Sequence, residues 1–107
     1  MLESEVESYL KKKCEALGWM CAKTHSPANA GFPDRTIIAD GRVVFVEMKR
    51  PGGKPRKLQM KVIARIRKAG GEACVVDCFE RADALVDILA NDLDIHAEES
   101  NHFLLEI

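Results

Sequence analysis

A carboxylate and an ammonium group close an apolar stretch of this sequence. Glu47 and Lys49 come directly after the run Val43–Val46. Because side chains alternate across a strand, an extended conformation puts Glu47 and Lys49 on one face, with their Cα atoms roughly 6.5–7 Å apart. Charged groups at the end of a buried strand are costly to desolvate without partners. The pattern therefore requires compensating groups nearby.

Asp34 supplies a second carboxylate, at the start of the preceding predicted strand. Asp40-Gly41 is a strong type I′ hairpin signal between the two strands. Asp34 and Glu47 each lie six residues from the nearer turn residue, so the hairpin brings them across from each other. Two converging carboxylates form a hard-oxygen site suited to Mg²⁺ or Mn²⁺. The alternative is an ordinary Lys–Glu or Lys–Asp pair at a strand end, because Glu-x-Lys alone is a weak pattern.

An α/β framework must position these side chains. Apolar residues at helical spacing predict helices over 4–17, 57–69 and 80–90. Extended apolar runs between turn signals predict strands over 19–24, 35–39, 42–49 and 73–76, which gives the order αβββαβα. In the second predicted helix, 57–69, the expected buried stripe is Leu58, Val62, Ile66 and Ala69. Strand 42–49 is nearly all apolar, so we expect it to be central and covered on both faces.

The length of 107 residues fits one domain over 1–107, with a core over about 3–90 and a C-terminal tail over 91–107. No apolar run is long enough to cross a bilayer, and the acidic N-terminus lacks the pattern of a secretion signal. We therefore expect a cytoplasmic protein, in a bacterium or a phage-infected host cell. The four cysteines form no CxxC pair and are expected to act as small hydrophobic residues.

Charge is unevenly distributed along the chain. Residues 42–68 hold ten Lys or Arg and one acid, whereas residues 71–107 hold ten acids and one Arg. This asymmetry indicates a surface that binds a polyanion. Two solvated faces that neutralise each other would give the same charge distribution. The basic residues suited to contact a nucleic-acid backbone are Arg50, Lys54, Arg56, Lys57, Lys61, Arg65, Arg67 and Lys68. Lys23, Ser26 and Arg35 flank the same edge and could contact phosphate.

The combination of these residues resembles the PD-(D/E)xK nucleases. The match is Pro33-Asp34, then Glu47-Met48-Lys49, on an αβββαβ core. More closely, the chain resembles the virus-type replication-repair nuclease (VRR-NUC) domains, through residues 23–27, 31–35 and 43–49 and through Gln59. The resemblance covers about residues 3–90. It implies a restriction-endonuclease-like fold: a mixed central sheet flanked by helices, with an added C-terminal helix and tail.

Roles for individual residues follow from the resemblance. It implies that Asp34, Glu47 and the backbone carbonyl of Met48 ligate the divalent ion. Lys49 would orient or deprotonate the attacking water and offset charge on the phosphate. The first helix of such enzymes adds an acid, for which Glu7 is preferred over the other helix-start acids, Glu3 and Glu5. Gln59 would lie in the shell of the active site, although a half-exposed glutamine near a helix start is the plain alternative.

The resemblance also implies an activity: Mg²⁺- or Mn²⁺-dependent hydrolysis of DNA phosphodiesters. The stand-alone members are expected to be homodimers that cut branched DNA such as four-way junctions, since two symmetric nicks need two active sites. A nuclease for flap, linear or single-stranded DNA shares the chemistry and differs in substrate. A non-catalytic nucleic-acid-binding module is the rival from another class, but it leaves Asp34, Glu47 and Lys49 unexplained.

Overall fold

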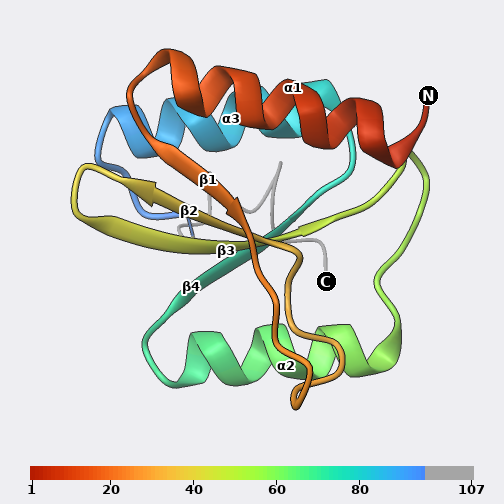
Figure 1. The fold of residues 1–107 in the computed structure, drawn as a ribbon. Coiled ribbons are helices and arrows are strands. Elements are labelled where there is room, and N and C mark those ends of the chain that lie inside the picture. The colour runs from red at the N-terminus through yellow and green to blue at the C-terminus, as the bar shows by residue number, and fades with distance from the viewer. Residues whose placement is uncertain (96–107) are drawn as a thin grey trace.

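Three helices and one four-stranded sheet make up the fold of the computed structural model, which describes residues 1–95 (Figure 1). Strand order in the sheet is β1-β2-β3-β4. The elements, in chain order, are α1 (Glu3–Ala16), β1 (Met20–Lys23), β2 (Arg35–Ala39), β3 (Arg42–Met48), α2 (Lys57–Lys68), β4 (Glu72–Val76) and α3 (Phe79–Ala90). Every predicted element is present, and no end is shifted by more than one residue.

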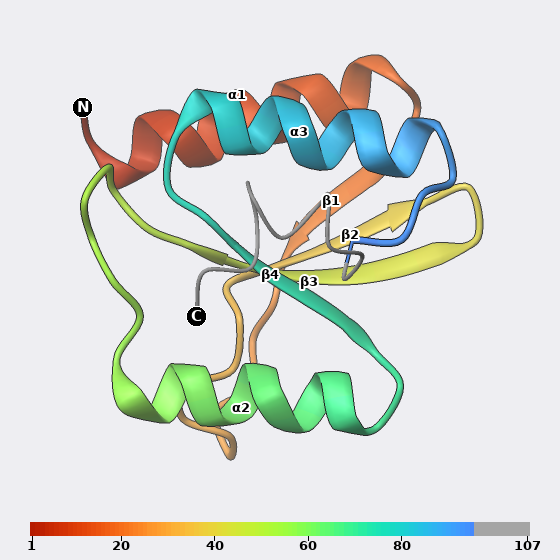
Figure 2. The same ribbon diagram turned by 180° about the vertical axis from the view of Figure 1, so that it is seen from behind.

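The sheet is mixed. β2 runs antiparallel to both β1 and β3, and β4 runs parallel to β3 after the crossover through α2. Helices α1 and α3 lie side by side over one face, and α2 lies against the other (Figures 1 and 2). This arrangement confirms the predicted α/β class with a mixed central sheet between helices, and β3 is central as expected.

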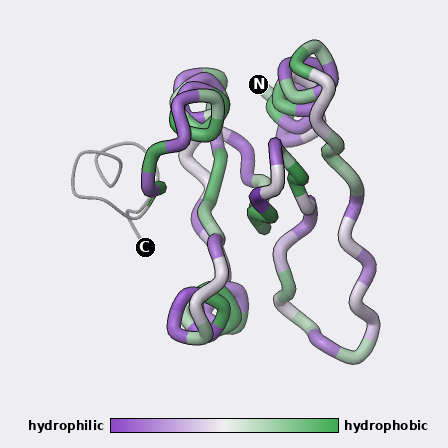
Figure 3. The backbone as a smooth tube through the Cα atoms, turned by 90° about the vertical axis from the view of Figure 1, so that its left-hand side faces the viewer, coloured by the Kyte–Doolittle hydropathy of each residue, from purple (hydrophilic) through white to green (hydrophobic). Residues whose placement is uncertain are grey.

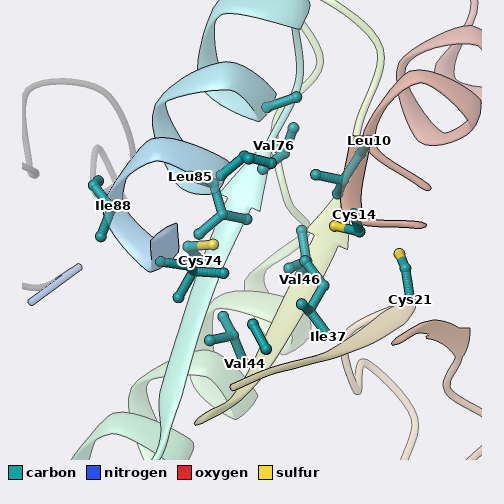
Figure 4. Packing of buried hydrophobic residues seen from close by; sticks show 14 of the residues in the cluster. Leu10, Cys14, Cys21, Ile37, Val44, Val46, Cys74, Val76, Leu85 and Ile88 are labelled. Atoms are coloured by element: carbon teal, nitrogen blue, oxygen red, sulfur yellow. The ribbon is translucent and has the colours of Figure 1, made fainter. Parts of the chain in front are cut away.

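The main core lies between the sheet and the α1–α3 pair (Figure 4). Alternate residues of the central strands, such as Val44, Val46 and Cys74, point into it and are fully buried. Across the helix pair, Tyr9 stacks on Phe79 with ring centroids 4.2 Å apart. Burying these side chains supplies the apolar free energy that holds the helices on the sheet. Cys14, Cys21 and Cys74 are buried free thiols, in line with their expected role as small hydrophobic residues.

The hairpin that aligns β2 with β3 has the predicted type I′ character. Asp40 and Gly41 both have positive φ, at 50° and 88°. Both central positions of a type I′ turn require this conformation, which Asp and Gly tolerate better than most residues. The resulting register pairs Arg35 with Val46, so the preceding residue Asp34 lies across from Glu47.

The buried face of α2 differs from the prediction. Leu58 is 48% exposed and Ala69 is exposed, whereas Gln59 and Ile63 are the residues that α2 buries. The helix is rotated because the Gln59 side chain is hydrogen-bonded beneath it to a carboxylate of the sheet. In the end-on view of Figure 3, the apolar side of α2 turns toward the long β1–β2 loop.

No helix within residues 1–95 is long and apolar enough to span a membrane. The cytoplasmic location stays a prediction. The apolar end of the tail, which could serve a dimer interface or cover the core of its own subunit, falls on residues 96–107, outside the part that the structure describes.

Candidate active site

The end of β3 carries the two charged residues that the sequence singled out. Glu47 is 1% exposed, and its Oε2 lies 3.3 Å from Nζ of Lys49. Alternation along β3 puts both side chains on the α2 side of the sheet, whereas Val46 and Met48 point into the core between sheet and α1. The predicted shared face of Glu47 and Lys49 is therefore confirmed.

Asp34 joins this pair from the entrance of β2. Its Oδ2 accepts a hydrogen bond from the backbone N–H of Met48 at 3.0 Å. Buried Pro33 precedes Asp34, and the Asp34 carbonyl accepts a hydrogen bond from the N–H of Thr24 at 2.7 Å. The carboxylate of Asp34 is therefore fixed at the β3 backbone, next to Glu47.

One oxygen of Glu47 is buried without a partner. Among the described residues, Oε1 of Glu47 is the one buried side-chain oxygen or nitrogen that makes no hydrogen bond. Burial, followed by the nearby charge of Asp34, raises the pKa of Glu47 to about 7, although Lys49 acts in the opposite direction. An unsatisfied buried carboxylate oxygen is costly and is typical of a position where a cation or a proton is needed.

Gln59 holds the other oxygen of Glu47. Its Nε2 donates to Oε2 of Glu47 at 2.9 Å, and its Oε1 accepts from the backbone N–H of Arg56 at 2.7 Å. The Arg56 N–H can only donate, which fixes the orientation of the Gln59 amide and leaves Nε2 for the carboxylate. The alternative of a half-exposed glutamine is wrong, because Gln59 is only 6% exposed.

Gly31 is a supporting residue that the sequence analysis did not single out. It has φ +84°, and a Cβ there would lie 2.9 Å from Cγ of Leu58 and 3.2 Å from the backbone nitrogen of Gln59. Only glycine allows the β1–β2 loop to approach the first turn of α2 this closely. The sole sequence signal was a glycine two residues before Pro33, inside the resembling stretch.

Glu7 does not join Asp34 and Glu47. Its Oε2 accepts from Nε of Arg35 at 2.6 Å, on the α1 side of the sheet. No group of three or more His, Cys, Asp or Glu side chains suited to a metal occurs within residues 1–95. The physical reason is that Arg35, only 8% exposed, needs a buried counter-charge, and Glu7 provides it. The structure therefore does not support Glu7 as a third metal ligand.

Arg35 is likewise not placed to meet a phosphate. Besides its ion pair with Glu7, its Nη1 donates to the carbonyl of Cys21 at 3.1 Å. Ser26 is half-buried, and its hydroxyl accepts a hydrogen bond from Asn29 at 3.0 Å. Arg67 donates to the carbonyl of Ala73, and burial lowers the pKa of Arg67. Arg35 and Arg67 are therefore held by partners within the fold, and Ser26 is bonded to a neighbour in its own loop.

The other expected DNA-contacting residues are open to solvent. The exposed members are Lys23, Arg50, Lys54, Arg56, Lys57, Lys61, Arg65 and Lys68. Lys54, Arg56 and Lys57 precede or begin α2, next to Gln59 in sequence. Exposed cations therefore surround the end of α2 that contacts Glu47.

Known proteins resemble this chain in sequence and in structure. No family model matches the sequence. "Putative nuclease p44" of Acyrthosiphon pisum secondary endosymbiont phage 1 is 34% identical over 84 residues, which is 78% of this chain and 90% of that protein. A solved structure described as a VRR_NUC domain superposes with a TM-score of 0.74 at 33% identity, covering 79% of this chain and 94% of that one.

Proposed function

From the premise that this chain belongs to the VRR_NUC domain family of nucleases, we propose that it is a Mg²⁺- or Mn²⁺-dependent endonuclease that hydrolyses DNA phosphodiesters. The observation that carries the proposal is the unpartnered buried Oε1 of Glu47, beside Asp34 and Lys49. A purely structural ion pair would use both carboxylate oxygens or leave the free one in water.

The residues present fit a hard divalent cation. Asp34, Glu47 and the Met48 carbonyl would hold it, and Mg²⁺ in proteins is commonly bound by one or two carboxylates together with waters and substrate phosphate oxygens. A site with two carboxylates is thus sufficient without Glu7. When bound, the ion supplies Lewis-acid polarisation of the phosphate and lowers the pKa of a bound water.

The side chains of the chain have distinct tasks in the proposed hydrolysis. Water adds to phosphorus, and the bond from phosphorus to the leaving ester oxygen breaks. Nζ of Lys49, a side chain that is 18% exposed, lies 3.3 Å from Oε2 of Glu47, where it can orient the water and offset charge that grows on the phosphate oxygens. Asp34 is held at the Met48 N–H and Glu47 at Gln59, so neither carboxylate has to reorganise as charge develops.

Four-way DNA junctions and a homodimer complete the proposal. Two symmetric nicks across a junction require two active sites, which a two-fold dimer supplies. An apolar row on the open part of the sheet supports self-association: Met20, Ile38 and Val43 are register neighbours and are 58%, 43% and 45% exposed. Such a contiguous apolar surface is typical of an interaction site.

Two alternative functions can be separated from this proposal by experiment. A nuclease for flap, linear or single-stranded DNA would use the same residues, and a non-catalytic binding module would use only the exposed cations. Labelled junction, flap, duplex and single-stranded DNA, incubated with Mg²⁺ or with Mn²⁺, separate them. We expect junctions to be cut fastest. Equal cutting of all substrates would remove the junction proposal, and no cutting of any would remove the nuclease.

A further inference from the structure

Helix α2 carries a row of four cations on its outer side. Lys57, Lys61, Arg65 and Lys68 are all exposed, and spacings of four, four and three residues put them on one side of the helix. Gln59 and Ile63 face the sheet on the opposite side. The row covers eleven residue steps, or about 16 Å at 1.5 Å per residue.

Within residues 1–95, these four charges have no counter-charge. Helix α2 contains no acidic residue, and none of the four forms an ion pair with any residue between 1 and 95. Some cations elsewhere in that part of the chain do have counter-charges, such as Lys13, which pairs with Asp83, and Arg42, which pairs with Glu72. A row of exposed cations without counter-charges on one helix is typical of a surface that binds a polyanion.

The row starts at the end of α2 nearest the proposed cleavage site, on the side of the helix that faces away from the sheet. Lys57 lies two residues before Gln59, whose amide contacts Glu47, and the row then follows α2 away from that edge of the sheet. Of the three helices between residues 1 and 95, α2 is the one on its face of the sheet (Figures 1 and 2), so neither α1 nor α3 covers its outer side. A DNA arm whose phosphate reaches Glu47 and Lys49 would pass the first turn of α2, and from there its backbone could follow the row.

The absence of aromatic residues from α2 favours double-stranded over single-stranded nucleic acid. Binding of single strands relies on exposed aromatic rings that stack on bases. Helix α2 has no aromatic residue, and the nearby Phe32 and Phe45 rings are packed edge to face against each other with centroids 5.2 Å apart. A straight, charge-only surface suits the regular backbone of a duplex.

We propose that the outer side of α2 binds the sugar-phosphate backbone of a double-stranded DNA arm next to the cleaved bond; this inference rests on the proposed nuclease function. The test is affinity for a labelled 30-base-pair duplex and for its single strand, without metal, over a range of salt concentrations. The variant is Lys61→Gln/Arg65→Gln. The matched control is Lys11→Gln/Lys12→Gln, which removes the same charge from exposed positions of α1 on the other face.

The α2 variant should bind the duplex several-fold more weakly, with a salt dependence of log K shallower by about 1.8, because each lost phosphate contact removes about 0.9. The α1 control should bind like the parent protein. Equal weakening by both variants, an unchanged α2 variant, or a loss confined to the single strand would overturn the inference. Metal-dependent cleavage by the parent protein is measured separately, so a failed nuclease proposal is recognised independently of the binding result.

Discussion

Nε2 of Gln59 donates a hydrogen bond to Oε2 of Glu47 at 2.9 Å, which leaves Oε1 of that carboxylate unpartnered. A helix and the central strand are thereby joined through the proposed metal ligand. The contact also explains why α2 buries a glutamine where an apolar side chain was expected.

Replacing Gln59 should weaken metal binding more than folding. Gln59→Met keeps a similar volume but cannot hold Oε2 of Glu47, so the carboxylate loses its fixed orientation. Loss of a hydrogen bond that orients a metal ligand typically costs roughly 10–100-fold in metal affinity or activity. Isothermal titration with Mn²⁺ measures the effect, and Met60→Ala at the exposed neighbouring position is the control. Unchanged Mn²⁺ affinity in Gln59→Met would contradict the positioning role.

Asp34→Asn should abolish cleavage and preserve the fold. The asparagine oxygen can still accept the hydrogen bond from the Met48 N–H, whereas the charge needed for the divalent ion is lost. We expect a drop of at least about 100-fold in the rate of cleavage of a labelled DNA junction, comparable to other losses of charge stabilisation at reacting phosphates or carbonyls. Circular dichroism and melting temperature check that the variant is folded. Cleavage at the parental rate would remove Asp34 from the site.

The metal-free protein should lose stability as the pH rises from about 4.5 to about 7. The folded-state pKa of Glu47 is raised from its ordinary 4.5 to about 7, chiefly by burial and then by Asp34. The contribution of this group is therefore complete below pH 4.5 and lost through pH 7, where folding has to bury a charge. Thermal unfolding in chelator from pH 5 to 8 measures it.

Glu47→Gln is the matched variant for that pH dependence. It should flatten this part of the stability profile, so that its advantage over the parent grows toward pH 8. A parallel pH dependence in both proteins would show that Glu47 does not titrate in this range. Since metal binding needs the ionised carboxylate, Mn²⁺ affinity of the parent should rise with pH up to about 7.

Breaking the Arg35–Glu7 pair should destabilise the fold. The two side chains are 10% and 18% exposed, and removal of one partner from a buried pair typically costs about 3–5 kcal/mol. Arg35→Met should therefore lower the free energy of unfolding in urea by an amount in that range. Lys23→Ala, at the exposed register partner of Arg35, should change it by less than about 0.5 kcal/mol. Equal effects of the two variants would show that the Arg35–Glu7 pair contributes no more to stability than an exposed cation does.

Gly31→Ala should cost more stability than Gly18→Ala. Both glycines have positive φ, at +84° and +78°, which costs an alanine about 1–2 kcal/mol. A Cβ at Gly31 also meets Leu58 at 2.9 Å, whereas nothing lies within 4 Å of one at Gly18. Overpacking of this kind adds about 1–3 kcal/mol. Urea unfolding of the two variants measures the difference, and equal losses would show that the loop yields without disturbing α2.

The sequence by itself determined the elements, the hairpin and the convergence of Asp34, Glu47 and Lys49, the proposed catalytic residues. Those features depend on local patterns: 3.6-residue and two-residue periodicity, the Asp40-Gly41 turn, and the position of Asp34 and Glu47 relative to it. Register follows from the turn, so the pairing of two strands could be counted from the residues that separate them.

Only the tertiary structure decided which polar residues have partners. Glu7 and Arg35 are 28 residues apart and Glu47 and Gln59 are 12 apart, and neither spacing encodes a contact. Helix α1 lies on the opposite face of the sheet from the Glu47 side chain, so its acid pairs with Arg35 there. The rotation of α2 likewise depends on the buried carboxylate beneath it. A buried charge takes its partner from whatever element packs against it, and that is set by the packing of the whole fold.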